Sequence, residues 1–354
     1  MNTSELTHPV LTVGIPTYNR PEYLRNTLSI FAQCDPSQFK ILICDDSTTD
    51  AVQDLVEDFF TCLPNLRYIR NEANLGFSAN VANLYKAVDT SYVWFLCDDD
   101  SIYLDSVNKV IGSISRLKPT VGIFNCSWQD SYGVDRIAGV KNTIEHINFE
   151  TFSNYDVLMR TSFLSILVFR KIDGVIERIT ENIEFKENVF VQITLALQLL
   201  SKKFHIAEIN ELILHRNVGF KYGEFYKFAF LDPLKSVYQL QSIFSFEKFK
   251  KWAIQSIPYC LLLFSSQKIG LFRYEGRITW ESENRLREYY GAYSSAIKAA
   301  IFLIGKTPDC LFRYSYFLVL LFKYRHFSIA HQQYKKLVDR ANHDNRDTGF
   351  TSYK

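Results

Sequence analysis

The residues best suited to do chemistry form one acidic stretch, in which a hydrophobic run (Trp94–Cys97) ends at Asp98, Asp99 and Asp100. Neighbouring carboxylates repel one another and are costly to shelter from water, unless a cation or hydrogen-bond donors lie among them. Hard divalent ions such as Mg²⁺ and Mn²⁺ bind carboxylate oxygens and commonly share their coordination with phosphate. The stretch therefore predicts a metal–diphosphate site. The alternative is a solvated turn that caps a helix expected over 104–117, since Asp is an ordinary N-cap residue.

Two other hydrophobic runs also end in polar residues. The run 10–15 ends at Pro16-Thr17-Tyr18-Asn19-Arg20, and the run 39–44 ends at Asp45-Asp46-Ser47. Both runs have the composition of buried parallel strands. In open parallel sheets, ligands bind outside the carboxyl ends of the strands. We therefore expect these two strand ends and the acidic stretch to lie on one edge of a sheet.

The elements that position these residues alternate along the chain. Helical spacing of apolar residues predicts helices over 21–31, 50–60 and 77–88, and further strands are expected over 66–69 and 92–97. Such alternation predicts an α/β fold with a doubly wound mixed sheet flanked by helices. No G-x-G-x-x-G follows the first strand and no G-x-x-x-x-G-K-[ST] occurs in the sequence, which disfavours dinucleotide-binding and P-loop proteins.

Four motifs occur in order: VGIPTYNRPEYLRNTL, ILICDDSTTD, NEANLGFSANVANLYKA and VWFLCDDDS. Together they resemble the N-terminal signature of family 2 glycosyltransferases of the GT-A fold, which are nucleotide-diphospho-sugar transferases. The resemblance is strong over residues 10–110 and weak from there to residue 216. It implies a GT-A type sheet, a nucleotide-diphospho-sugar donor and a divalent metal cofactor, Mn²⁺ or Mg²⁺.

The resemblance also implies a set of residues that bind the donor nucleotide. They are Pro16, Thr17, Tyr18, Asp45, Asp46, Asn74, Gly76, Asn80, Asp98 and Asp99. The first three match a loop whose backbone cradles the nucleotide, and the two acids that follow match the position that accepts hydrogen bonds from the base. Asn74, Gly76 and Asn80 match an element near the diphosphate and ribose. Their alternative role is a turn followed by a polar helix face.

The acidic stretch matches the D-x-D motif of this family, in which the first acid reaches the ribose and the last binds the metal. The implied metal ligands are Asp100, Asp98 and His215, the last at the end of an expected strand over 211–214. Arg216 follows, and arginine suits bidentate contact with phosphate. A single histidine is often structural, so that alternative stays open.

The catalytic base is expected further along the chain. The family commonly has a Glu-Asp pair before an apolar helix, and the matching stretch here contains Glu187 followed by Asn188. An amide cannot accept the proton of the acceptor hydroxyl, so Glu187 is the first candidate for the base of an inverting reaction and Glu184 the second. Either glutamate could instead stabilise a helix N-terminus. Asn188 motivates one alternative function, a nucleotide-sugar-binding module without catalysis. A second alternative, a metal-dependent nucleotidyltransferase, lacks its usual Gly-rich, Lys-containing loop after Ile15.

Charge divides the chain into an expected glycosyltransferase domain over 8–218 and a basic, aromatic, helical region over 219–354. Residues 1–218 hold 19 Lys and Arg against 27 Asp and Glu, whereas residues 219–354 hold 21 against 11. The most apolar pieces of the basic region, 258–264 and 316–322, are shorter than the ~20 residues that span a bilayer. Amphipathic helices there suit an anionic membrane surface or packing against the first domain. A nucleic acid partner is disfavoured because no recognised binding motif accompanies the charge.

The cysteine pattern and the N-terminal residues bear on the expected cellular location of the protein. The seven cysteines form no C-x-x-C pair, and the first nine residues contain no apolar signal segment, which favours the cytoplasm. The family resemblance and the basic region together imply a saccharide acceptor that is lipid-linked. The expected function is bacterial surface polysaccharide synthesis, of O-antigen or capsule, by a peripheral enzyme on the inner face of the cytoplasmic membrane.

Overall fold

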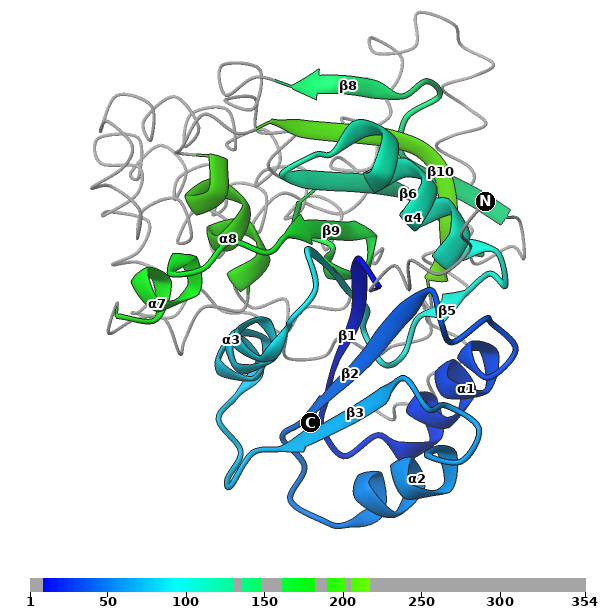
Figure 1. Ribbon diagram of the computed structural model, residues 1–354, viewed down its shortest axis with the longest axis vertical. Coiled ribbons are helices and arrows are strands. Elements are labelled where there is room, and N and C mark those ends of the chain that lie inside the picture. Colours follow the sequence, from blue (N-terminus) through cyan, green and yellow to red (C-terminus); the bar gives the residue numbers. More distant parts are fainter. Residues whose placement is uncertain (1–8, 130–134, 148–160, 182–189, 201–204, 217–354) are drawn as a thin grey trace, which may run out of the picture. The chain divides into compact units, whose positions relative to one another are not determined.

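The computed structural model describes residues 9–129, 135–147, 161–181, 190–200 and 205–216 (Figure 1). The strands in these ranges are β1 (Leu11–Thr17), β2 (Phe39–Asp45), β3 (Leu66–Arg70), β4 (Tyr92–Phe95), β5 (Ser101–Ile102), β6 (Val121–Gln129), β7 (Asp135–Ala138), β8 (Ile144–Ile147), β9 (Leu167–Arg170) and β10 (Ile206–Arg216). The helices are α1 (Pro21–Phe31), α2 (Ala51–Phe59), α3 (Phe77–Ala87), α4 (Ser106–Leu117), η1 (Leu164–Ile166), α7 (Val175–Thr180) and α8 (Val191–Leu200).

The strands form one mixed sheet in the order β3-β2-β1-β4-β9-β6-β10-β5. Strands β3, β2, β1 and β4 are mutually parallel, whereas β9 is antiparallel to both of its neighbours, β4 and β6. The short strand β5 is antiparallel to β10, and β7 and β8 pair with β6 and β10. Figure 1 shows α1 and α2 on one side of β1–β3 and α3 on the other. The predicted fold class, an α/β mixed sheet flanked by helices, is confirmed.

The first part of the sheet follows directly from the sequence pattern. All seven residues of β1 are buried, as expected for a parallel strand covered on both faces. Helix α1 begins at Pro21, whose fixed φ suits the first helical turn, and buries Leu24, Leu28 and Phe31 along one side. Helix α2 buries Val52, Leu55, Val56 and Phe59 at the same spacing.

The region around the acidic stretch differs from the prediction. The strand expected over 92–97 ends at Phe95, and β5 separates the three acids from α4. The N-cap residue of α4 is Asp105, and Asp98 and Asp100 are only 4% and 3% exposed. The alternative of a solvated acidic turn that caps this helix is therefore wrong. The strand expected over 211–214 is also longer, because it begins at Ile206 and pairs with β6 along its length.

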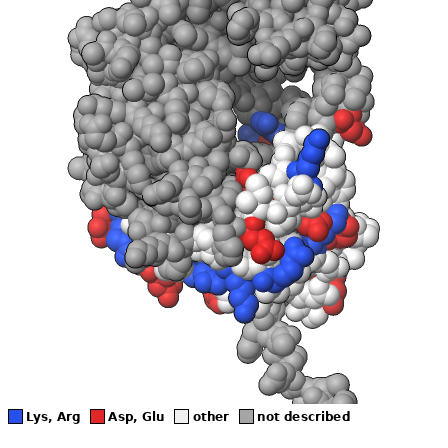
Figure 2. All heavy atoms as spheres, turned by 90° about the horizontal axis from the view of Figure 1, so that it is seen from above, with Lys and Arg blue, Asp and Glu red and all other residues white. Residues whose placement is uncertain are grey.

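Charges of both signs are mixed on the surface of the described residues. Figure 2 shows Lys and Arg side chains interspersed with Asp and Glu on one face. Exposed ion pairs such as Lys40–Asp89 (2.7 Å) and Arg25–Asp58 (3.8 Å) join neighbouring elements. Among the described residues, no helix is both long and apolar enough to cross a membrane. The predicted domain boundary at 218/219 and the basic region lie outside the described residues.

Candidate active site

The carboxyl ends of β1, β2 and β4 lie at one edge of the sheet, as the motif order predicts. Thr17 pairs with Asp45 in the β1–β2 register, and the backbone N–H of Leu96 donates to the carbonyl of Gly14 across β4 and β1 (2.9 Å). The hydroxyl of Thr17 donates to Oδ2 of Asp98 (2.8 Å). The first and fourth motifs, 81 residues apart, are therefore in direct contact.

The acid loop, residues 96–100 between β4 and β5, contains carboxylates with different partners. Arg20 donates to Oδ1 of Asp98 (3.2 Å) and to Oδ2 of Asp99 (3.4 Å). Burial raises the pKa of Asp98 to about 6, although Arg20 and the Thr17 hydroxyl both act in the opposite direction. Burial also raises the pKa of Asp99 against the charges of Arg20 and Arg216. Both acids are thus held in surroundings that disfavour their charge unless a further cation is nearby.

The donor atoms of Asp99, Asp100 and Cys97 lie within 4.8 Å of one another. Burial raises the pKa of the Cys97 thiol well above its ordinary value, so the thiol is protonated and is a poor ligand. The two carboxylates are the oxygen donors that Mg²⁺ and Mn²⁺ prefer. The residues present therefore fit a hard divalent ion. Asp98 is not in this cluster, since its oxygens face Thr17 and Arg20.

Strand pairing brings His215 and Arg216 to the acid loop. His215 lies opposite Ser101, the residue that follows Asp100, in the β10–β5 register. Its Nδ1 is 2.9 Å from the Ser127 hydroxyl, which is 2.6 Å from the Tyr103 hydroxyl. The charge of Arg216 opposes the rise in the pKa of Asp99, and its guanidinium lies over the Phe163 ring, 4.8 Å from the ring centroid. The Ser127 hydrogen bond orients the His215 ring, which is not a member of the cluster that Cys97, Asp99 and Asp100 form.

Asp45 and Asp46 are buried and hold the neighbouring loop. Asp46 accepts hydrogen bonds from the backbone N–H groups of Leu75 (2.9 and 3.0 Å) and Gly76 (2.8 Å) and from the Asn71 amide (2.9 Å). Asp45 accepts from the Ser47 N–H (2.9 Å) and the Tyr68 hydroxyl (2.7 Å). In this structure the Asp46 carboxylate shapes the 71–76 loop beside the strand ends, and the predicted contact of both acids with a base stays a prediction.

The third motif forms the same loop and the start of α3. Oδ1 of Asn74 accepts from the Gly76 N–H (2.9 Å), which makes a turn. The Asn80 amide donates to the carbonyl groups of Cys44 (3.0 Å) and Thr17 (3.4 Å), so it joins α3 to both strand ends. Asn80 is 2% exposed and does not lie on a solvated polar face. Tyr18 is 45% exposed beside these residues, whereas Pro16 is buried in β1.

Some of the predicted site residues lie outside the described structure, and some residues at the site were not predicted from the sequence. The two candidate bases, Glu187 and Glu184, and Asn188 fall in the range 182–189, outside the described residues. The sequence reasoning missed Ser165, which donates to Asp100 (2.6 Å), and the Tyr103–Ser127 pair. The available signal for Ser165 was its position as a lone hydroxyl inside the apolar run 163–169.

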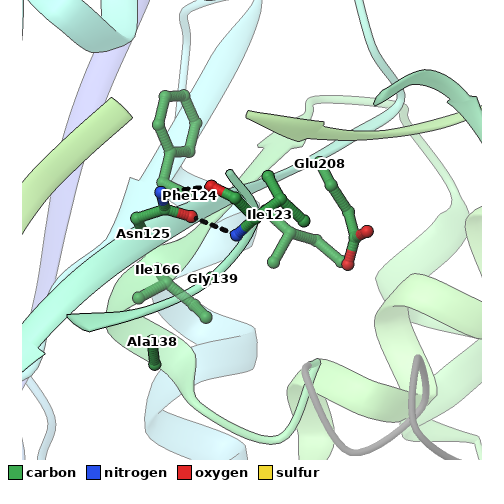
Figure 3. Close-up of a pocket in the computed structure, with 8 residues that line it drawn as sticks. Ile123, Phe124, Asn125, Ala138, Gly139, Ile166 and Glu208 are labelled. Carbon is green, nitrogen blue, oxygen red and sulfur yellow. Dashed lines mark hydrogen bonds between the residues drawn. The ribbon is translucent and has the colours of Figure 1, made fainter. Parts of the chain in front are cut away.

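A separate small pocket lies between β6, β7 and β10 (Figure 3). The side chain of Asn125 forms one wall by donating to the carbonyl of Val140 (2.9 Å) and accepting from its N–H (2.8 Å). Among the described residues that line it, Glu208 alone is charged. None of the described residues that line this pocket is a cation to offset that carboxylate, whereas Arg20 accompanies the acids of the strand-end site, which is therefore the better place for an anionic diphosphate.

Residues 12–162 match the model of the Glycosyl transferase family 2. This stretch, less than half of the chain, has the sequence pattern of that family. The resemblance stated from the four motifs is thereby confirmed. The matched residues include β1, β2, β3 and β4, and hydrogen bonds join the ends of β1, β2 and β4 to one another and to α3.

Three curated relatives match stretches of 97 to 113 residues of this chain. An uncharacterized protein of Mycobacterium tuberculosis, Rv1520, is 29% identical over 113 residues, which are 31% of this chain and 32% of Rv1520. Abequosyltransferase RfbV of Salmonella typhimurium is 32% identical over 97 residues, 26% of this chain and 29% of RfbV. TuaG of Bacillus subtilis, named as a candidate glycosyltransferase of teichuronic acid biosynthesis, is 26% identical over 102 residues, 28% of this chain and 40% of TuaG. The matched part thus spans about a third of the length of these relatives.

Solved structures share the fold at low identity. S. aureus TarS 1-349 in complex with UDP-GlcNAc has a TM-score of 0.58 and 14% identity, covering 97% of this chain and 93% of that chain. The mannosyltransferase PcManGT from Pyrobaculum calidifontis, in complex with GDP-Man and Mn²⁺, has a TM-score of 0.51 and 15% identity, covering 98% of this chain and 90% of that chain. The GT-A expectation for the fold is therefore confirmed.

Proposed function

We propose that the chain is a metal-dependent inverting glycosyltransferase that moves a sugar from a nucleotide-diphosphate donor to a glycan acceptor. The observation that carries this proposal is the cluster of acids beside Arg20 at the carboxyl ends of β1 and β4. Arg20 pairs with Asp98 (3.2 Å) and Asp99 (3.4 Å), and Asp99 and Asp100 belong to one group whose donor atoms lie within 4.8 Å of one another. The sugar-nucleotide complexes of TarS and PcManGT, which share the fold, support the donor class.

The residues of the site have different proposed roles in donor binding. Asp99 and Asp100 would hold the divalent ion, with His215 as a further ligand, and Arg20 and Arg216 would contact the diphosphate. The bound ion would stabilise the negative charge that develops on the leaving diphosphate. Asp98 faces Thr17 at the end of β1, which suits its predicted contact with the ribose. Pro16, Thr17 and Tyr18 then line the nucleotide side of the same edge.

The acceptor hydroxyl needs a base on the face of the sugar opposite the diphosphate, because a neutral hydroxyl is a weak nucleophile. Glu187 is the first candidate for this base, and Glu184 is the second. A single in-line displacement would invert the anomeric centre. The acceptor is proposed to be a lipid-linked saccharide in surface polysaccharide synthesis, which the name of TuaG supports. The basic region 219–354 is proposed to bring the enzyme to the inner face of the membrane.

A donor-hydrolysis assay tests the enzymatic part of the proposal. The full chain is incubated with UDP-GlcNAc, UDP-glucose, GDP-mannose or dTDP-sugars and Mn²⁺, and the release of nucleoside diphosphate is measured. We expect release from one donor, its loss on addition of a chelator, and at least a 100-fold reduction in Asp100→Asn. The control Asp105→Asn changes an exposed carboxylate outside the site and should behave as wild type.

One further outcome of this assay and one additional assay distinguish the alternative functions. Tight donor binding without release, even with glycan acceptors present, would indicate a binding module that lacks catalysis. Release of pyrophosphate from a sugar phosphate and a nucleoside triphosphate would indicate a nucleotidyltransferase. In an active enzyme, Glu187→Gln should abolish transfer while donor binding persists. If Glu187→Gln and Glu184→Gln both retain full turnover, neither glutamate is the base.

A further inference from the structure

The Ser165 hydroxyl connects η1 to the acid loop. Ser165 is fully buried, and its Oγ accepts a hydrogen bond from the backbone N–H of Cys97 (2.9 Å). The same Oγ is 2.6 Å from Oδ2 of Asp100. The Ser165 carbonyl also accepts from Nε1 of the buried Trp94 (2.7 Å). The hydroxyl of Ser165 is thus bonded to the acid loop, and its carbonyl is bonded to β4, the strand that precedes this loop.

The direction of each hydrogen bond follows from the groups involved. A backbone N–H can only donate, so Oγ is the acceptor toward Cys97. The hydroxyl has one proton, and an ionised carboxylate can only accept, so this proton is directed to Asp100. A bond from a neutral hydroxyl to a carboxylate is of the stronger, charge-assisted kind. It fixes the position of Oδ2 and with it the plane of the Asp100 carboxyl group.

Fixing this carboxylate matters because groups that hold metal ligands in place contribute to metal affinity. Loss of such a partner typically costs 10–100-fold in affinity. Ser165 is 65 residues from Asp100 along the chain and follows the stretch 12–162 that matches the family model. The contact therefore joins the family-matched segment to the strand β9 that comes directly after η1.

We propose that Ser165 is a positioning residue of the donor site, which orients Asp100 for the divalent ion and the donor diphosphate. This inference rests on the proposed function, since it requires Asp100 to be a metal ligand. The role assigned to Ser165 is to hold Asp100, since its buried hydroxyl is engaged by Asp100 and by the Cys97 N–H.

The test compares two buried serines that differ in what they contact. Ser106 is also fully buried, accepts from the Tyr103 N–H (3.0 Å) and donates to a backbone carbonyl, that of Ile213. The variants Ser165→Ala and Ser106→Ala therefore each lose one hydroxyl with two hydrogen bonds. Mn²⁺ is titrated into the full chain with UDP, GDP, CDP or dTDP present, and free Mn²⁺ is followed by electron paramagnetic resonance. Thermal unfolding is recorded in parallel.

We expect Ser165→Ala to weaken Mn²⁺ binding by about 10-fold or more. Ser106→Ala should change it by less than about 2-fold, although both variants lose comparable thermal stability. If Ser165→Ala does not fold, Ser165→Cys takes its place, since a thiol keeps the shape but is a weak donor. The cysteine variant should then also bind Mn²⁺ more weakly than wild type.

Different results would contradict the positioning role of Ser165 and the proposed metal site. If Asp100→Ala loses Mn²⁺ binding but the Ser165 variants bind as tightly as Ser106→Ala, the positioning role is wrong and the metal site stands. If Asp100→Ala binds Mn²⁺ like wild type, or wild type binds none with any of the four nucleotides, the proposed metal site is wrong and the role of Ser165 falls with it.

Discussion

At the scale of single residues, the three acids of the acid loop are neighbours in sequence but not in environment. Asp98 is tied to Thr17 and Arg20, Asp99 shares Arg20, and Asp100 is held by Ser165. The motif alone predicts a metal–diphosphate site here, and that site stays a prediction. The motif could not predict which acid faces which partner, because those partners come from residues far away in the chain.

The raised pKa of Asp98 gives a prediction for stability. Its pKa rises from an ordinary 3.8 to about 6, so between these values the folded protein binds more protons than the unfolded chain. The free energy of unfolding of the metal-free protein should therefore decrease as pH rises through this window. Asp98→Asn removes the buried charge and should raise the free energy of unfolding at pH 7.5, by at most about 3 kcal/mol.

Urea unfolding of wild type and Asp98→Asn at several pH values, with a chelator present, checks this prediction. The advantage of the variant should shrink toward pH 4, where Asp98 is neutral in the folded wild type and only partly ionised in its unfolded chain. The exposed Asp105→Asn serves as control and should show no such trend. An advantage that is independent of pH would contradict the burial argument.

At the scale of elements, local patterns specified the helices and parallel strands well. Apolar spacing predicted α1, α2 and α3 to within two residues, because each buries one face against the sheet. The sequence did not reveal β5 or the antiparallel insertion of β9 between β4 and β6. These short strands exist through pairing with distant partners, and no local periodicity distinguishes them.

The loop before α3 gives a prediction at this scale. Gly76 has φ +83° and ψ 160°, a conformation that is essentially restricted to glycine, and its N–H donates to Asp46. Gly76→Ala should therefore destabilise the protein by about 1–3 kcal/mol. It should also weaken nucleotide binding, since the 71–76 loop lies beside the strand ends that are proposed to bind the nucleotide.

Gly112 is a matched control for the same change. It is exposed within α4, and no atom lies within 4 Å of the position that a Cβ would take. Gly112→Ala should stabilise the protein by about 0.5–1 kcal/mol, since alanine is the better helix former. Equal effects of the two substitutions in thermal unfolding would show that the Gly76 conformation is not needed.

At the scale of the whole molecule, charge separates the sequence into an acidic first part and a basic remainder. Residues 219–354 hold 21 basic against 11 acidic residues. We therefore expect the full chain to bind vesicles that contain 30% phosphatidylglycerol and not vesicles of phosphatidylcholine alone. Cosedimentation measures this, and added salt should release the protein. Binding that ignores both lipid charge and salt would contradict an electrostatic role for the basic region.

The central claim is that the acid loop binds a nucleoside diphosphate through a divalent ion. Calorimetric titration with UDP, GDP, CDP and dTDP, with and without Mn²⁺, on wild type and Asp100→Ala tests it most directly. We predict that one nucleotide binds tightly, that binding requires Mn²⁺, and that it is lost in the variant. If no nucleotide binds, or if binding depends on neither Mn²⁺ nor Asp100, the account of this site is wrong.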